Sequence, residues 1–325
     1  MNKQPTPGRE EILVRCARLY YKERISKSDI AKKLSISAMQ VTRLLREAES
    51  RGIVKIDIFA QPNVKEIQQK LIEKYNLLRV TIVETSNDYG VLKKRLGEAA
   101  AKILEEQVSL RPNISVGIGG GSTIYEMIEA LEDRPRHIAI YPMAMIGRGP
   151  EVTFFDSAYL CTHLLLKSRP VAKAFVLGIP PLPSVPRAAK IFVEKLINSI
   201  PEINTVLNQS RNVDLAFVGL GGYLPFDEII KELSKVKITN EKLKELGAVG
   251  GINYNYFDSK GKQIGHFLLT VTVDDLRKRS SNPSTLISLV AGGKHKFEAI
   301  RTAIRTKMVN SLITDLATGE QMLVE

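Results

Sequence analysis

The sequence predicts an α/β protein in which a small helix-turn-helix precedes a larger domain with a mostly parallel sheet. Two patterns support this prediction. Between Ser26 and Ile58, two short amphipathic segments are followed by an alternating one, and beyond Tyr75 short aliphatic segments alternate with longer amphipathic segments. With 325 residues, of which 44% are hydrophobic, the chain is long enough for both parts.

Each of the two short segments carries a helix start signal. Ser26 is followed three residues later by Asp29, and Ser37 by Gln40, which is the spacing of a capping box. Helices this short are stable only when their apolar faces pack together. The residues that share these faces are Ile30, Ala31 and Leu34 in the first helix and Val41, Leu44, Leu45 and Ala48 in the second.

The turn between the two helices departs from the usual pattern at Ser35. Many such turns have glycine there because the backbone is left-handed, so Ser35 predicts some strain or a slightly different turn. After the second helix, Arg51-Gly52 is a stop signal, and residues 53–58 alternate as a strand. These features together predict a winged helix-turn-helix.

The face opposite the apolar one in the second helix is the candidate DNA-reading surface. Arg43 and Arg46 have side chains that bind guanine edges or phosphate, and Met39 is suited to contact a thymine methyl group. The alternative explanation is an ordinary helical hairpin with a solvated basic face. The candidate DNA-binding residues are Ser37, Met39, Gln40, Thr42, Arg43, Arg46 and Lys55.

The distribution of charge also favours DNA as the partner. Residues 1–60 contain thirteen Lys or Arg and seven Asp or Glu, so this segment holds +6 of the formal net charge of +12. A positive field concentrated in this way binds phosphate by releasing counterions. Basic charge alone also suits RNA or acidic lipid, so it supports the helix pattern and does not replace it.

The composition excludes several other classes of protein. No segment approaches the roughly 20 apolar residues of a membrane span, and the N-terminal segment lacks the apolar core of a signal peptide, so a cytoplasmic protein without a membrane partner is expected. Cys16 and Cys161 are interpreted as buried thiols and not as a disulfide. Cys161 with His163 does not supply enough ligands for a metal, so no metal site is expected.

A domain boundary is expected at residues 60–63. Pro62 stops the wing strand, and Asn63 is a suitable cap for the next helix. The sequence therefore predicts a DNA-binding domain over residues 1–60 and a larger domain over residues 61–325. Residues 64–75 read as an amphipathic helix that joins the two, and we expect it to make a dimer contact.

Beyond this boundary, short aliphatic segments typical of buried strands alternate with helical patterns. Strands are predicted at residues 79–84, 114–118, 138–141, 174–177, 215–218 and 286–290, and helices at residues 89–106 and 123–132. This alternation predicts a mostly parallel, Rossmann-like sheet with helices on both faces.

Three glycine-rich segments end strands of this sheet, and open parallel sheets bind ligands at the carboxyl ends of their strands. Residues 116–123 (VGIGGGST) lead directly into a helix, so backbone amides, two hydroxyl groups and the helix dipole meet at a point that suits phosphate. Residues 218–222 and 290–296 (VAGGKHK) end two further strands, and the second segment offers two lysines. Glycine is also what tight turns require, so each segment alone has a structural explanation.

Together the three segments predict a site for a small anionic ligand. The candidate ligand-binding residues are Gly119, Gly120, Gly121, Ser122, Thr123, Gly219, Gly221, Gly292, Gly293, Lys294 and Lys296, with Arg148 as a further source of positive charge. The first segment matches neither a Walker sequence nor a GxGxxG fingerprint with its acidic partner, which argues against ATP and NAD. No cofactor and no catalytic residue are expected.

These segments resemble the SorC family of sugar-responsive bacterial regulators over nearly the whole chain. The resemblance rests on SKSDIAKKLSIS with VTRLLREAESRGIV, on VGIGGGST, on DLAFVGLGG, on AVGGINYNYFDSKGKQI and, most specifically, on LVAGGKHKFEAIRTAIRTKMVNSLITDLATGEQML. It implies a winged helix-turn-helix fused to an effector domain that resembles phosphosugar isomerases and is usually assembled as a tetramer. We therefore expect a homodimer or homotetramer. The resemblance also implies a sugar or phosphosugar as the effector.

Residue by residue, the resemblance places the family's phosphate loop at Gly121–Thr123 and the lysine of its AGGxxK segment at Lys296. Two positions depart from the family. Gly251 stands where relatives often have a carboxylate that holds sugar hydroxyls, and Ala144 stands where relatives have an arginine or a lysine able to form a Schiff base. Covalent capture of an aldehyde is therefore not expected.

The sequence thus predicts a transcriptional regulator, not an enzyme, whose binding to a double-stranded DNA operator is controlled by a small anionic sugar or phosphosugar. An isomerase or deaminase with a DNA-binding head is one alternative, but those reactions need a positioned carboxylate base, which Gly251 does not supply. Constitutive DNA binding with a degenerate pocket is the other alternative.

Overall fold

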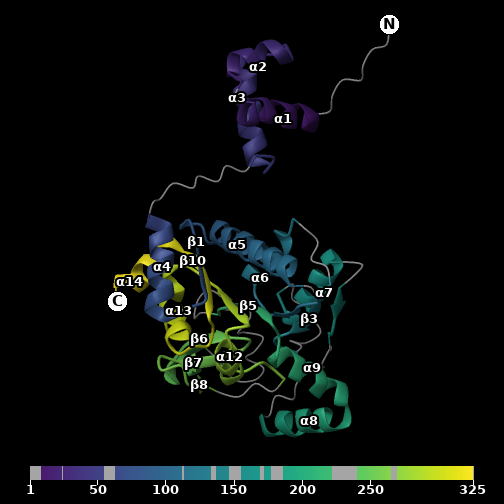
Figure 1. The fold of residues 1–325 in the computed structure, drawn as a ribbon, viewed down its shortest axis with the longest axis vertical. Helices are drawn as coiled ribbons and strands as arrows, with labels where there is room; N and C mark the ends of the chain where they lie inside the picture. The colour runs from purple at the N-terminus through teal and green to yellow at the C-terminus, as the bar shows by residue number, and fades with distance from the viewer. Residues whose placement is uncertain are drawn as a thin grey trace. The chain divides into compact units, whose positions relative to one another are not determined.

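The computed structural model describes residues 9–23, 25–54, 63–111, 113–132, 137–145, 155–168, 172–176, 186–221, 240–264 and 269–324 (Figure 1). The chain divides into two compact units, Met1–Gln61 (unit 1) and Pro62–Glu325 (unit 2). Each unit is folded around a hydrophobic core of its own.

The described part of unit 1 is helical. Helix α1 (Arg9–Ala17) continues into a π-helical turn (Arg18–Lys22), which is followed by α2 (Lys27–Leu34) and α3 (Ala38–Ser50). Both predicted helix starts are confirmed. The hydroxyl of Ser26 accepts a hydrogen bond from the amide of Asp29 at 3.2 Å, and Ser37 forms a reciprocal capping box with Gln40 at 3.1 and 2.8 Å.

The core of unit 1 forms where these helices meet. Val41 and Leu45 of α3 are buried together with Ile30 and Ala31 of α2 and with Cys16 of α1. These buried positions fix the rotation of α3 about its axis, so the opposite face of α3 is left to solvent.

The turn between α2 and α3 has the left-handed backbone that its position predicts. Ser35 has φ 53° and ψ 43°, a conformation that is costly for any residue with a Cβ atom. The amide of Ser35 donates to Lys32 O at 3.3 Å and that of Ile36 to Ala31 O at 3.0 Å, so the helix end is closed as a glycine-capped one would be.

The segment after α3 is described only at its beginning. Ile53 and Val54 pack against a second small cluster that contains Leu13 and Ala48. Residues 55–62, which include Lys55 and most of the predicted wing, lie outside the described residues. The winged form of the helix-turn-helix therefore stays a prediction.

Unit 2 is built on a seven-stranded sheet in which all neighbouring strands run parallel, in the order β1-β10-β9-β5-β2-β3-β4. The strands are β1 (Arg79–Val83), β2 (Ser115–Ile118), β3 (Ala139–Pro142), β4 (Lys173–Ala174), β5 (Leu215–Gly219), β9 (Leu286–Val290) and β10 (Ser311–Asp315). The chain winds outward from β2 to β4 and then returns to place β5 on the other side of β2. The direction of winding thus reverses between β2 and β5.

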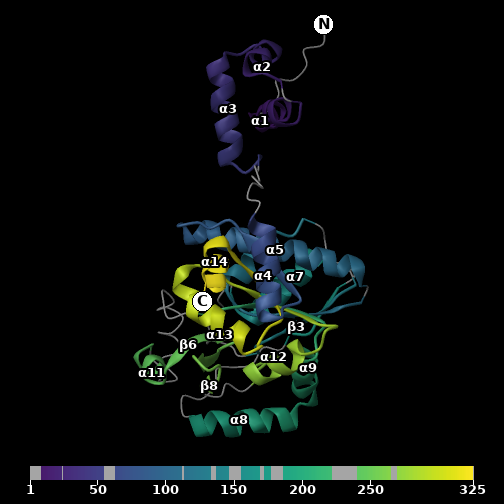
Figure 2. The same ribbon diagram turned by 60° about the vertical axis from the view of Figure 1, so that its left-hand side comes forward.

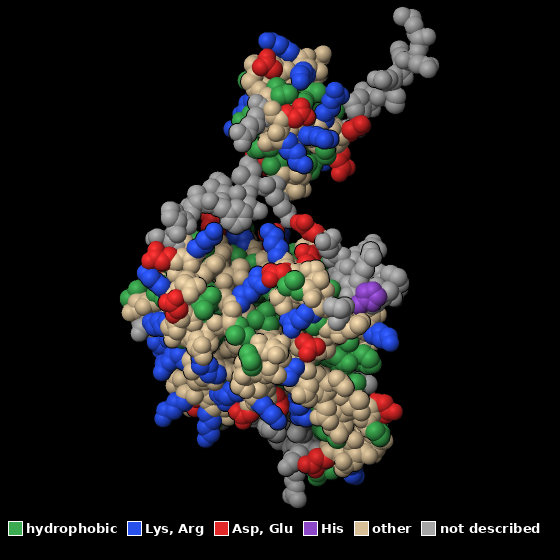
Figure 3. Space-filling model, viewed as in Figure 1, with side chains coloured by type: hydrophobic (Ala, Val, Ile, Leu, Met, Phe, Trp, Pro, Cys, Tyr) green, Lys and Arg blue, Asp and Glu red, His purple; other side chains and the backbone are tan. Residues whose placement is uncertain are grey.

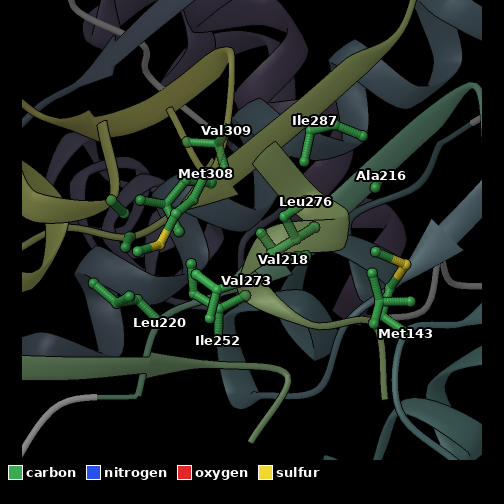
Figure 4. Packing of buried hydrophobic residues seen from close by; sticks show 14 of the residues in the cluster. Met143, Ala216, Val218, Leu220, Ile252, Val273, Leu276, Ile287, Met308 and Val309 are labelled. Atoms are coloured by element: carbon green, nitrogen blue, oxygen red, sulfur yellow. The ribbon is translucent and has the colours of Figure 1, made fainter. Parts of the chain in front are cut away.

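Helices cover both faces of this sheet (Figures 1 and 2). One face carries α4 (Asn63–Tyr75), α8 (Pro186–Ser199), α9 (Pro201–Arg211), α12 (Val273–Ser280), α13 (Phe297–Arg305) and α14 (Leu316–Val324), and the other carries α5 (Tyr89–Leu110), α6 (Ser122–Glu129) and α7 (Ser157–Ser168). Ala216 and Val218 of β5 face the first layer and belong to the same buried cluster as Leu276 of α12 (Figure 4), and Leu215 and Phe217 face the second. The alternation explains why β5 is apolar throughout.

A second, antiparallel sheet extends the end of the main sheet. It consists of β6 (Ala248–Ile252), β7 (Asn255–Asp258) and β8 (Gln263–Ile264), and α11 (Asn240–Glu245) precedes it. A pair of backbone hydrogen bonds joins Gly251 of β6 to Gly221 after β5, and another bridge joins Thr270 to Ala144 after β3. The small sheet is therefore fixed against the carboxyl ends of the parallel strands.

The α/β prediction is confirmed, with two differences. The six predicted strands are present, but the one expected at residues 174–177 covers Lys173–Ala174, and neither Phe175 nor Val176 belongs to it. Strand β10 and the small sheet were not predicted, because SLITD mixes polar with apolar residues and β6 contains Gly250 and Gly251.

Candidate functional site

The three predicted glycine-rich segments meet at one edge of the sheet. They follow β2, β5 and β9, which are neighbours in the sheet and run in the same direction. A Cβ atom on Gly219 would lie 2.9 Å from the carbonyl oxygen of Gly120, so the segments after β2 and β5 touch through their backbones. This is the switch point of the winding, where open α/β sheets bind ligands.

The first segment leads into α6 through a left-handed glycine, Gly121, with φ 123°. The amide of Gly119 donates to Phe217 O and that of Gly121 to Phe155 O, both at 2.8 Å, so these two amides are already used. The hydroxyls of Ser122 and Thr123 form no hydrogen bond with the described residues, although both side chains are buried. They stand at the start of α6, where an anion is favoured by the helix dipole.

The third segment is packed around a buried carboxylate. The amide of Gly293 donates to Asp315 Oδ1 at 2.7 Å, and a Cβ atom on Gly292 would lie 2.5 Å from the same oxygen. Thr318 and Thr85 also donate to this carboxylate, at 2.6 and 3.1 Å. Gly292 and Gly293 therefore have a clear structural role, which is to let the loop after β9 approach Asp315.

The two lysines of this segment differ sharply in their surroundings. Lys294 is exposed, whereas Lys296 is only 4% exposed. The Nζ atom of Lys296 donates to Leu220 O at 2.6 Å and lies 5.5 Å from the centre of the Tyr89 ring. Burial, with a smaller effect of the Lys93 charge, lowers the pKa of Lys296 to about 8.

Sequence reasoning missed the polar residues beside the first segment. Asn253 and Tyr254, at the tip of the β6–β7 hairpin, lie next to Gly119 and Gly120, and the Tyr254 hydroxyl donates to Asp156 Oδ1 at 2.9 Å. Nothing in a linear sequence connects this hairpin with a loop so far from it. At Gly251, where relatives often have a carboxylate, an added Cβ atom would meet the Tyr256 ring at 3.0 Å.

Arg148, the remaining predicted member of the ligand site, lies outside the described residues. A cavity of about 580 Å³ lies elsewhere in unit 2, next to the ends of α4 and α13. Four basic side chains line it, those of Lys74, Arg301, Arg305 and Lys307. Lys74 donates to the carbonyls of Met322 and Leu323 at the end of α14, and Lys307 donates to the carbonyl of Tyr75 at the end of α4. These two lysines therefore lie at the negative ends of helix dipoles and already bind carbonyl oxygens.

The candidate DNA-reading face is on α3. Arg43 and Arg46 are exposed, and Met39 is 83% exposed, as the predicted rotation of the helix requires. Figure 3 shows Lys and Arg side chains over the visible face of unit 1 with acidic ones between them. Glu47 on the same helix is held by Arg9 of α1 at 3.2 and 2.8 Å, which lowers the pKa of the carboxyl.

The other predicted DNA-binding residues of α3 have structural hydrogen bonds. The hydroxyl of Ser37 and the amide oxygen of Gln40 form the capping box, and the Thr42 hydroxyl donates to Ala38 O at 3.1 Å. Ser37, Gln40 and Thr42 thus take part in holding the helix, whereas Met39, Arg43 and Arg46 are exposed.

The predicted nature of the cysteines is confirmed. Cys16 and Cys161 are free, buried thiols that lie in different units, and burial raises the pKa of each. His163 contacts Glu129 at 2.6 Å, and its ring is stacked with that of Tyr125 and with that of Tyr159. No cluster of potential metal ligands occurs within the described residues, and none of their helices is long and apolar enough to cross a membrane.

Comparison with known proteins finds relatives that match nearly the whole chain. The deoxyribonucleoside regulator of Bacillus subtilis (strain 168) is 25% identical over 328 residues, which cover 97% of this chain and 98% of that protein. The transcriptional regulator LsrR of Escherichia coli (strain K12) is 25% identical over 317 residues, covering 97% and 95%. Both similarities thus extend over the two units.

Solved structures share the fold. The full-length sorbitol operon regulator SorC from Klebsiella pneumoniae has a TM-score of 0.72 at 20% identity and covers 98% of this chain and 100% of its own. A transcriptional regulator from Streptococcus pneumoniae TIGR4 has a TM-score of 0.66 at 22% identity, covering 81% and 97%. Residues 61–324 match the family described as "Putative sugar-binding domain". The resemblance to SorC-type regulators is thereby confirmed, and the chain belongs to this sugar-binding-domain family.

Proposed function

We propose that this protein is a transcriptional regulator that binds DNA through unit 1 and a sugar or phosphosugar through unit 2. The observation that carries the proposal is the exposed face of α3, where Met39, Arg43 and Arg46 point away from a core that fixes the helix. The named relatives, which are regulators over nearly the full length of this chain, support it.

DNA recognition follows from the dimensions of α3. A helix of 13 residues fits the major groove of B-DNA, and its N-terminal turns are the part that usually contacts bases. We propose that Arg43 and Arg46 bind guanine edges or phosphates and that Met39 contacts a thymine methyl group. A homodimer or homotetramer in the cytoplasm would present two such helices to a palindromic operator.

Effector binding uses the edge of the sheet between β2, β5 and β9. Ser122 and Thr123 offer hydroxyls at the start of α6, and Lys296 offers a buried ammonium group that bonds Leu220 O, just after β5. We propose that these three residues hold the phosphate or another anionic group of the effector. A ligand changes operator affinity only if it binds the DNA-competent and incompetent states unequally, and the coupling is reciprocal.

The test begins with sites selected from a random duplex library by the wild-type protein. Arg43→Ala should weaken binding to the selected site by about tenfold or more, because a bidentate arginine–guanine contact is worth roughly 1–3 kcal/mol. Arg15→Ala is the matched control, since it removes the same charge from an exposed position on α1. If Arg43→Ala binds the selected site as tightly as Arg15→Ala does, α3 is not the reading helix.

The same binding reaction, repeated with a panel of sugar phosphates, tests the effector. One member of the panel should change operator affinity, and it should stabilise unit 2 by roughly 2.7 kcal/mol at one hundred times its Kd. Ser122→Ala combined with Lys296→Met should abolish this response and leave DNA affinity intact. A panel that changes neither melting temperature nor DNA binding would favour a constitutive DNA-binding protein.

A further inference from the structure

The tip of the β6–β7 hairpin is strained where it meets the candidate effector site. Asn253 and Tyr254 form the two-residue turn, with φ 51° and 64°. Turns of this kind strongly prefer glycine at the second position, because a residue with a Cβ atom is disfavoured in the left-handed region. Tyrosine at that position is an outlier, and such outliers are concentrated at functional sites.

The side chain of Asn253 has an unused acceptor at this point. It is 7% exposed, and its Oδ1 atom is buried and accepts no hydrogen bond from the described residues. The same oxygen would lie 3.1 Å from a Cβ atom on Gly119, so the amide rests against the first glycine-rich segment. A buried acceptor without a donor is costly, and a ligand hydroxyl at this position would satisfy it.

Tyr254 approaches the same segment from the next position of the turn. A Cβ atom on Gly120 would lie 3.7 Å from the Tyr254 hydroxyl, which donates to Asp156 Oδ1 at 2.9 Å. The residue before that aspartate, Phe155, accepts the amide of Gly121 at 2.8 Å. The hairpin tip and the start of α7 thus frame the loop from two sides.

The hairpin tip is also held rigidly in place. Asn255, the first residue of β7, is fully buried, and its Nδ2 atom lies within hydrogen-bonding distance of four acceptors. These are Asn253 O at 3.0 Å, Thr270 Oγ1 at 3.1 Å, Val271 O at 3.1 Å and Ile252 O at 3.4 Å. The strained turn is therefore imposed by its surroundings, as expected of a preorganised binding element.

We propose that Asn253, together with the Tyr254–Asp156 pair, reads a hydroxyl group of the effector and so selects a phosphorylated polyhydroxy compound over phosphate itself. This inference rests on the proposed effector site, to which it adds the selectivity element. The phosphate group is held by Ser122, Thr123 and Lys296, while the hydroxyl beside it donates to Asn253 Oδ1. The hairpin tip thereby supplies the polar group that is missing at Gly251.

The test compares four probes by titration calorimetry: inorganic phosphate, methyl phosphate, ribose 5-phosphate and glucose 6-phosphate. The variant is Asn253→Gly, which removes the amide and tolerates the left-handed backbone, so that folding is preserved. It should leave the affinities for inorganic phosphate and methyl phosphate within twofold of wild type. Its affinity for the sugar phosphate that wild type binds best should fall by about fivefold to tenfold, as the loss of one hydrogen bond predicts.

Two further variants separate the possible explanations. Tyr254→Phe, which keeps the ring and removes the contact with Asp156, should also weaken sugar phosphates selectively, and Asn204→Ala on the surface of α9 should change nothing. Equal losses for all four probes in Asn253→Gly, or no loss for any, would overturn the inference and leave the proposed effector site standing. A wild-type protein that binds none of the four would overturn both.

Discussion

Ser35 is a residue whose conformation works against its own chemistry. The left-handed region costs a residue with a Cβ atom roughly 1–2 kcal/mol, whereas glycine costs roughly 0.5–1 kcal/mol in conformational entropy. The first effect is the larger, so Ser35→Gly should stabilise unit 1 by about 0.5–1 kcal/mol, measured as an increase in the melting temperature of its transition. Ser35→Ala is the control, because alanine keeps the strain. If the glycine variant is no more stable than the alanine variant, the left-handed backbone at Ser35 does not destabilise unit 1.

Lys296 makes the proposed effector site sensitive to pH. The pKa of its ammonium group in the free protein is about 8, and a bound anion favours the charged form and so raises this pKa. Well below pH 8 the ammonium group is protonated in both the free and the anion-bound protein. As pH rises above 8 the free protein loses this proton first, so the affinity for the anion should decrease, by at most about tenfold per pH unit. Two nearby groups stay neutral as pH rises through 8. Burial raises the pKa of Tyr89 to about 12, and burial lowers the pKa of His295.

Calorimetric titration of wild type with a sugar phosphate between pH 7.5 and 9.5 measures this dependence. Lys296→Arg is the comparison, because a guanidinium stays charged throughout. A flat affinity profile in wild type would mean that Lys296 does not face the anion.

The buried ammonium of Lys296 also lowers the stability of unit 2 below pH 8, because the unfolded chain binds the proton more tightly than the folded one. This cost disappears only as pH rises toward the ordinary lysine pKa. Lys296→Met should therefore melt at a higher temperature than wild type at pH 7.

Residues of α3 were predictable from the sequence because helical periodicity alone decides which of them face solvent. Buried Val41 and Leu45 fix the phase, and exposed Met39, Arg43 and Arg46 follow from it. The role of Asn253 was not predictable in this way, because its neighbour Gly119 comes from a distant loop. Periodicity describes one element, whereas a ligand site depends on which elements the fold brings together.

At the scale of elements, the same contrast separates the strands that were predicted from those that were missed. Strand β9 is apolar except for Ser288 at its centre, and it was predicted with its observed bounds. Strand β10 is buried along its whole length but contains Ser311, Thr314 and Asp315. The hydroxyl of Ser311 bonds with that of Ser288 at 3.0 Å, and Asp315 binds the loop after β9. Partners in other elements make Ser311 and Asp315 compatible with burial, and the segment itself does not reveal them.

The glycine-rich loops show how far a motif alone can lead. The order of β9, β5 and β2 confirms that the three loops gather at one edge of the sheet. The motif did not distinguish glycines that leave room for a ligand from those that leave room for the protein itself. Gly219 approaches Gly120 O, and Gly292 approaches Asp315, so both are required for packing between loops.

For the whole molecule, the division into two units with separate cores has a thermodynamic consequence. Units 1 and 2 each bury their own apolar residues, so each is expected to unfold as its own cooperative transition. Scanning calorimetry of the full chain should resolve two transitions. Ser35→Gly should raise only the transition of unit 1, and a bound sugar phosphate should raise chiefly that of unit 2.

An effect of the bound effector on the transition of unit 1 measures the regulation itself. If the effector changes operator affinity tenfold, linkage requires that the operator change effector affinity tenfold, which is about 1.4 kcal/mol of coupling. This coupling should appear as a shift of the unit 1 transition when the effector is added in the presence of the selected DNA, and it should vanish in Ser122→Ala with Lys296→Met. A single merged transition that Ser35→Gly and the effector raise equally would contradict the independence of the units. Regulation would then have to be sought in the folding of the whole chain and not in communication between two folded parts.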